Sequence, residues 1–217
     1  MDRDDAESSR RAGECEALGW GRAYAGDYPA AFVFLSKAHA LRRTGGGATD
    51  SSRVVGLAIA RAKTRQWHGA HGEAQTLLVE ALWHAHRTGI DPDITSVLVS
   101  LADLALDVGD YHLAQAILTE TLPRRLRDRY YSVGQLELLG LVEFGLGRPR
   151  HAVRLIGAAI AIRDAMGVNP VIPAIAIRMR RFHRAARQLL GEDDYDAQFR
   201  VGRATDLVAA VAKALAS

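Results

Sequence analysis

The sequence is poor in cysteine, aromatic residues and proline, and these shortages exclude several classes of protein. Cys15 is the only cysteine among 217 residues, which excludes an internal disulfide and a zinc site built from several cysteines. Aromatic residues make up 6% of the chain, and there are six prolines. No apolar run approaches the roughly 18 residues of a membrane-spanning helix. The polar start of the chain lacks the apolar region of a secretory signal. We therefore expect a cytoplasmic protein that has no membrane segment.

Runs of β-branched residues with a period of two are also missing, whereas apolar residues at helical spacing recur throughout. Val97, Leu101, Leu104 and Val108, for example, follow one helical stripe. This spacing predicts an all-α protein. We predict helices near residues 5–25, 28–43, 51–67, 71–88, 93–108, 111–122, 126–146, 149–166, 171–190, 193–201 and 205–216.

One pattern occurs four times along the chain. A glycine is followed five residues later by an alanine, and four residues after that by an aliphatic residue. The glycines are Gly26, Gly69, Gly109 and Gly147, which are 43, 40 and 38 residues apart. Seven residues before each glycine stands a small residue, which is Gly19, Ala62, Ala102 or Gly140. Such repetition is typical of stacked helix pairs that share a core between neighbours.

Each position of the pattern has an expected structural role. The small residue allows two antiparallel helices to approach closely, and the glycine ends the first helix with a positive φ. Asp27 and Asp110 follow their glycines and can accept hydrogen bonds from free amides at the start of the second helix. We expect Tyr28 and Tyr111 to fill the corner between the two helices.

The succession Leu-Gly, Gly-Asp-Tyr, Ala, Leu and Ala at these offsets resembles the tetratricopeptide repeat. The copies are longer than the usual repeat and look like the MalT-like variety. This resemblance implies a tetratricopeptide-like α-α superhelix, a right-handed solenoid of about five helix pairs. It also implies one domain over 1–217, with repeats at about 5–45, 50–90, 92–123, 126–167 and 171–216.

Residues 147–167 and 190–207 resemble segments of the helical C-terminal regions of LuxR-type and related NTPase-containing regulators of actinobacteria. The chain has no G-x-x-x-x-G-K-[ST] motif, so the phosphate-binding loop of those regulators is missing. It ends at Ser217, where a helix-turn-helix often follows in that family. The resemblance implies a non-catalytic scaffold for protein interaction or effector sensing in transcription regulation. Its partners would be a protein or peptide segment, NTPase or DNA-binding regulator domains, or a small effector. A homodimer is possible, because an uncapped end of a repeat stack often pairs with another copy.

No combination of residues predicts an enzyme, a metal site or a cofactor. His84 and His86 lie two residues apart and so point to different faces of a helix. The acidic run from Glu192 to Asp196 suits a helix start, where it complements the helix dipole. Cys15 has no partner histidine that position alone can assign, and we interpret it as a small core-facing thiol.

The resemblance places ligand binding on the inner surface, which is formed by the first helix of each pair. Trp20, Trp67 and Tyr24 would be costly to leave exposed there without use, although they can equally be core residues. The inner surface lacks the set of Lys, Arg and Asn residues that clamps a peptide carboxylate. The predicted groove residues are Trp20, Tyr24, Lys63, Trp67, Ser96, Asp103, Asp107 and Glu137.

An alternative function follows from the uneven charge of the chain. Residues 1–119 carry 12 Lys+Arg and 15 Asp+Glu, whereas residues 120–217 carry 16 and 10. Arg180, Arg184 and Arg187 share one helical face at i, i+4 and i+7. This basic face predicts either a nucleic-acid-binding module or a solvated surface that pairs with neighbouring carboxylates.

Overall fold

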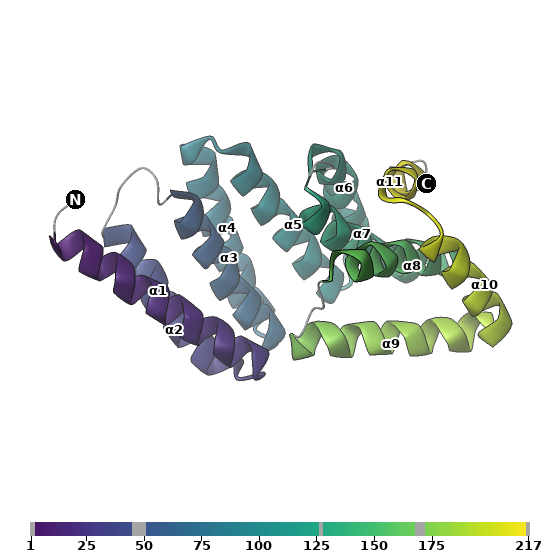
Figure 1. Ribbon diagram of the computed structural model, residues 1–217, viewed down its shortest axis with the longest axis horizontal. Helices are drawn as coiled ribbons and strands as arrows, with labels where there is room; N and C mark the ends of the chain where they lie inside the picture. Colours follow the sequence, from purple (N-terminus) through teal and green to yellow (C-terminus); the bar gives the residue numbers. More distant parts are fainter. Residues whose placement is uncertain (1–2, 45–50, 126–127, 168–171, 216–217) are drawn as a thin grey trace. The chain divides into compact units, whose positions relative to one another are not determined.

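The computed structural model describes residues 3–44, 51–125, 128–167 and 172–215, and this part of the chain is all-α (Figure 1). It contains eleven α-helices and the short 3₁₀-helix η2 (Leu122–Arg125). The α-helices are α1 (Arg3–Tyr24), α2 (Tyr28–Thr44), α3 (Ser51–Trp67), α4 (His71–Thr88), α5 (Asp91–Asp107), α6 (Tyr111–Thr121), α7 (Arg129–Gly145), α8 (Pro149–Met166), α9 (Pro173–Leu190), α10 (Glu192–Arg203) and α11 (Leu207–Leu215). Each helix predicted from the sequence has a counterpart, so the all-α prediction is confirmed. The predicted boundaries 126, 171 and 216 fall outside the described residues.

The helices pack mainly against their neighbours in sequence. Helix α1 packs on α2, α3 on α4 and α7 on α8, while α2 contacts α3 and α6 contacts α7. This order of contacts is consistent with a helical repeat array. The chain divides into an N-terminal unit (Met1–Leu104 with Ile172–Ala174) and a C-terminal unit (Ala105–Val171 with Ile175–Ser217). The single superhelical domain stays a prediction.

The small residues of the repeated pattern lie where paired helices approach most closely. A Cβ atom at Gly19 would lie 2.7 Å from Cγ of Leu35 in the paired helix α2. A Cβ atom at Gly140 would lie 2.8 Å from Cγ1 of Ile156 in α8. Such distances are too short for real carbon atoms, so only glycine permits these two pairs to pack as they do. The expectation from the sequence is therefore confirmed at Gly19 and Gly140.

The four repeated glycines end the first helix of each pair in the left-handed conformation. Their φ angles are 82°, 87°, 82° and 78° at Gly26, Gly69, Gly109 and Gly147. Oδ1 of Asp27 accepts a hydrogen bond from the amide of Ala30 at 3.2 Å. Oδ1 of Asp110 accepts one from the amide of Leu113 at 3.1 Å. These aspartates therefore cap the second helix, as predicted.

The two corner tyrosines reach beyond their own helix pair. The ring centroid of Tyr28 lies 5.8 Å from that of Trp67, and Tyr111 fills the space that a Cβ atom on Gly145 would need. Trp67 and Gly145 each stand two residues before the turn glycine of the following helix pair. The prediction placed both tyrosines in the corner of their own pair. In the structure they also join that pair to the next one.

The second helix of each pair turns its alanine and aliphatic stripe into the core. The equivalent positions are all fully buried, namely Ala31 and Leu35, Ala74 and Leu78, Ala114 and Leu118, and Ala152 and Ile156. Near the C-terminus the order of packing changes, because α10 and α11 both contact α8. A Cβ atom at Gly157 would lie 2.7 Å from the carbonyl oxygen of Phe199, so glycine permits α8 and α10 to cross closely. No repeated motif in the sequence signals this second close crossing.

Candidate functional site

The predicted groove residues of the N-terminal unit are largely engaged with one another. Lys63 in α3 and Asp103 in α5 form an ion pair, and their side chains are only 15% and 9% exposed. Nε2 of Gln66 donates to the carbonyl oxygen of Asp103 at 3.1 Å, and Nζ of Lys63 donates to Oε1 of Gln66 at 3.2 Å. Oγ of Ser96 donates to the carbonyl oxygen of Pro92 within the same helix at 2.9 Å. The polar atoms of Lys63 and Asp103 therefore join α3 to α5, whereas Ser96 bonds within α5.

The predicted aromatic residues differ in their surroundings. Trp20 is half-buried and packs against the core that includes Leu35. Tyr24 lies with its ring centroid 6.4 Å from that of Trp20 and is 52% exposed. Trp67 is half-buried beside Tyr28. Trp20 and Tyr24 thus form one local aromatic pair, and Trp67 belongs to a different contact.

In the C-terminal unit, both predicted acidic residues are paired with arginines. Oδ1 of Asp107 lies 3.0 Å from Nη1 of Arg178, and each side chain is 24% exposed. Glu137 in α7 forms an ion pair with Arg163 in α8, with both side chains 13% exposed. These pairs join helices within the unit. That any of the eight residues binds a ligand stays a prediction.

The basic face of α9 is only partly available to a partner. Arg180 and Arg184 are exposed. Nε of Arg187 donates to Oε2 of Glu192 at 3.0 Å, and the guanidinium lies 4.2 Å from the ring centroid of Tyr195. One of the three predicted arginines is therefore neutralised by a carboxylate and stacked on an aromatic ring.

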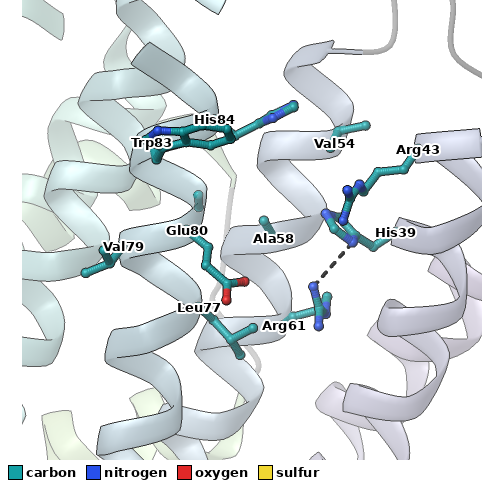
Figure 2. A pocket seen from close by; sticks show the side chains of 11 residues that line it. His39, Arg43, Val54, Ala58, Arg61, Leu77, Val79, Glu80, Trp83 and His84 are labelled. Carbon is teal, nitrogen blue, oxygen red and sulfur yellow. Dashed lines mark hydrogen bonds between the residues drawn. The ribbon is translucent and has the colours of Figure 1, made fainter. Parts of the chain in front are cut away.

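A hollow of about 660 Å³ opens between α2, α3 and α4 of the N-terminal unit (Figure 2). We call it the α2–α4 groove. Its lining residues come from all three helices and are His39, Arg43, Val54, Ala58, Arg61, Leu77, Val79, Glu80, Ala81, Trp83 and His84. None of the eight predicted groove residues is among them. The volume falls within the range of about 300–1,000 Å³ that is usual for small-molecule sites.

Helix α3 explains why the groove differs from the predicted surface. Val54, Ala58 and Arg61 stand at i, i+4 and i+7, so they share one face of α3 and line the groove. Lys63 lies two residues beyond Arg61, or roughly 200° around the helix axis. The surface predicted by family resemblance therefore uses a different face of the same helix. The i, i+4, i+7 spacing of these α3 residues can be read from the sequence. The residues of α2 and α4 that line the groove opposite them cannot.

Arg61 is held in a fixed position in the groove. Its Nε donates to Oγ of Ser36 at 3.0 Å, and Nη1 lies 3.2 Å from Nδ1 of His39, as Figure 2 shows for the histidine. The guanidinium also lies 5.6 Å from the ring centroid of Phe32. Burial lowers the pKa of Arg61 from its ordinary value, while the charge of Glu80 opposes this effect. The side chain nevertheless remains a cation, because arginine does not lose its proton in proteins.

His39 is the neutral partner of that cation. Burial lowers the pKa of His39 to about 4, and the charges of Arg61, Arg43 and His84 act in the same direction. Because arginine can only donate, the contact with Arg61 requires an unprotonated Nδ1 on His39. Near neutral pH, His39 therefore orients Arg61 without adding charge to the groove.

The arginines of the groove differ from the buried Glu143 of α7 in having no oppositely charged partner among the residues that the structure describes. Neither Arg43 nor Arg61 forms an ion pair with a carboxylate of the described residues. The buried Glu143 of α7, by contrast, accepts from Gln115 at 2.8 Å and pairs with Arg148 at 3.0 Å. Figure 2 shows the carboxylate of Glu80 directed into the space between α3 and α4. The groove therefore offers two cations and one anion that have no ion-pair partner in the described part of the chain.

The described residues contain neither a cluster of metal ligands nor a membrane-spanning helix. They contain no group of three or more His, Cys, Asp or Glu side chains that could hold a metal ion. Among the same residues, no helix combines the length and the apolar character that crossing a membrane requires. Comparison of the chain with protein-family models, with curated proteins and with solved structures gives no match.

Proposed function

We propose that this protein is a non-catalytic binding scaffold whose α2–α4 groove captures a ligand. We further propose that it is a tetratricopeptide-like module similar to the C-terminal helical region of a bacterial transcriptional regulator. The repeated pattern around Gly26, Gly69, Gly109 and Gly147 supports this assignment, together with the packing of helices in sequential pairs. The captured ligand would be a small effector or a short segment of a protein, and its capture would be relayed to other regulator domains.

The observation that carries this proposal is the composition of the α2–α4 groove. Apolar residues such as Val54 and Leu77 provide surface for burial, and Arg43, Arg61 and Glu80 provide charged groups in its lining. A largely apolar hollow with a few convergent polar groups is the usual form of a ligand site. Because helix pairs hold these residues in place, binding would require little ordering of the chain.

A variant that fills the groove tests this proposal. Ala58→Leu places extra carbon atoms on the α3 wall, where Ala58 is 8% exposed. Ala40→Leu in α2 makes the same chemical change at an exposed site and serves as the control. Each protein is incubated with a bacterial lysate and re-isolated, and mass spectrometry then identifies the retained small molecules and peptides. We expect a compound retained by the wild type and by Ala40→Leu to be missing from Ala58→Leu.

Circular dichroism of both variants checks that helical content is unchanged. If Ala58→Leu and Ala40→Leu retain the compound equally, the proposal that the α2–α4 groove binds it is contradicted. The alanine variants of Trp20 and Trp67 address the surface predicted from the sequence. If they abolish retention while Ala58→Leu does not, the ligand binds that surface and not the α2–α4 groove.

A further inference from the structure

We infer that the ligand of the α2–α4 groove is a small amphipathic monoanion. Its carboxylate would lie between Arg43 and Arg61, and its apolar body would lie against the wall of α3 and α4. This inference rests on the proposed function and deepens it, because it specifies the chemical class of the ligand.

The two arginines provide the recognition of the anion. Arg61 is oriented by Ser36 and His39, so little rotational freedom remains to be lost when a ligand binds. Arg43 lines the same groove from α2, near its end at Thr44. A guanidinium group presents parallel N–H donors that match the two oxygens of a carboxylate. Two such groups without a carboxylate partner in the described residues favour an anionic ligand over a neutral one.

The charge of the groove favours a single negative charge on the ligand. Apart from His84, which also lines the groove, two arginines and Glu80 sum to one positive charge, and His39 adds none near neutral pH. A carboxylate balances that charge, whereas a phosphate ester carries about one and a half to two negative charges at pH 7. The excess charge of a phosphate would face the carboxylate of Glu80. Glu80 therefore acts as a selectivity element against doubly charged ligands.

The apolar residues that line the groove favour a ligand with an apolar part. Val54, Ala58 and Leu77 line the groove beside the polar groups, and Trp83 lines it from α4 (Figure 2). The volume of about 660 Å³ suits a small molecule that has a ring or a short alkyl chain. Burial of such a body supplies the affinity, while the arginines supply the orientation and the selection for charge.

Three probes that share one apolar body test the inference by isothermal titration calorimetry at neutral pH. They are 3-phenylpropionate, the neutral 3-phenylpropanol and 3-phenylpropyl phosphate. We expect 3-phenylpropionate to bind about tenfold more tightly than the alcohol, since a hydrogen bond to a charged group contributes about that factor. We also expect it to bind more tightly than the phosphate ester.

Two variants locate the effect in the groove. Arg43→Gln should weaken binding of 3-phenylpropionate by about tenfold. Glu80→Gln should strengthen it several-fold and should reduce the preference over the phosphate ester. A purely structural role of Glu80 would not produce this gain. Arg11→Gln changes an exposed arginine of α1 and should leave the affinity unchanged.

Each contrary result has a defined meaning. If acid and alcohol bind equally and Ala58→Leu abolishes both, the groove binds ligands but the inference about charge is wrong. If the phosphate ester binds most tightly, the inference that the ligand carries a single negative charge is wrong. If none of the probes binds, the inference fails. Retention of other ligands by the wild type and not by Ala58→Leu would then still support the proposed function.

Discussion

We expect three half-buried histidines to make the stability of this protein sensitive to acid. Burial lowers the pKa values of His39, His151 and His183, and for His39 the value falls to about 4. An unfolded chain protonates its histidines at about pH 6.5. Between that pH and about pH 4, the unfolded chain therefore binds protons that folded His39 does not bind. The free energy of unfolding consequently decreases as the pH falls through this window.

The variant His39→Gln tests this dependence. Its side-chain carbonyl can still accept from Arg61, but it cannot take up a proton in the unfolded chain. We expect the free energy of unfolding, measured with urea between about pH 7 and about pH 4.5, to fall less steeply than in the wild type. His86→Gln changes an exposed residue of α4 and is the control. It should leave the pH dependence of the free energy of unfolding unchanged. Parallel slopes for His39→Gln and the wild type would contradict the assignment.

Two glycines of α7 predict opposite effects of the same substitution. A Cβ atom at Gly140 would meet Ile156 and lie 3.3 Å from the carbonyl oxygen of Ala152, whereas one at Gly134 would meet nothing within 4 Å. We expect Gly140→Ala to destabilise the protein by about 1–3 kcal/mol, because α8 must move away. Gly134→Ala should stabilise it by about 0.5–1 kcal/mol through helix propensity. Urea unfolding of both variants measures the difference, and equal effects would show that Gly140 does not set the spacing of α7 and α8.

At the scale of the element, each second helix depends on how its first turn is capped. Asp110 caps α6 through the amide of Leu113, while the residues at the equivalent positions before α4 and α8, Ala70 and Arg148, make no such side-chain bond. We expect Asp110→Ala to lower the free energy of unfolding by about 1 kcal/mol. Asp110→Asn retains an acceptor and should cost much less. Thermal unfolding followed by circular dichroism compares them, and similar losses in both would rule out capping as the cause.

At the scale of the whole molecule, the excess of arginine over residues 120–217 bears on the nucleic-acid alternative. Within the C-terminal unit, several arginines already face carboxylates. Arg150 pairs with Asp194 at 2.8 Å and Arg203 with Asp164 at 2.9 Å, in addition to the pairs of Arg178 and Arg187. Arg180 and Arg184 are exposed. The number of arginines in this half therefore overstates the basic surface that a phosphate backbone could contact.

We accordingly expect only weak binding to duplex DNA, which salt abolishes. Fluorescence anisotropy with a labelled duplex at about 50 mM and about 200 mM salt measures it, because counterion release makes phosphate contacts strongly salt-dependent. The double variant Arg180→Gln, Arg184→Gln should remove whatever binding exists, and Arg43→Gln should not. Tight binding that persists at about 200 mM salt would favour the nucleic-acid function over the proposed scaffold.

The sequence by itself determined the helices, many of their ends to within a few residues, and much of their packing against neighbours in sequence. Helical periodicity, turn glycines such as Gly109 and small residues such as Gly140 act over a few residues or one turn, so their effects can be read from spacing alone. The same spacing correctly indicated the buried stripe at Ala114 and Leu118. The family resemblance predicted a binding site on the face of α3 that carries Lys63.

Only the tertiary structure decided which charges find partners and which remain available. Lys63 pairs with Asp103, 40 residues away, whereas Arg61 on another face of α3 has no carboxylate partner in the described part of the chain. The α2–α4 groove exists because three helices bring side chains from His39 to His84 around one hollow. The physical reason is that ion pairing and cavity shape depend on distances between helices, and a periodic pattern along the chain does not encode those distances.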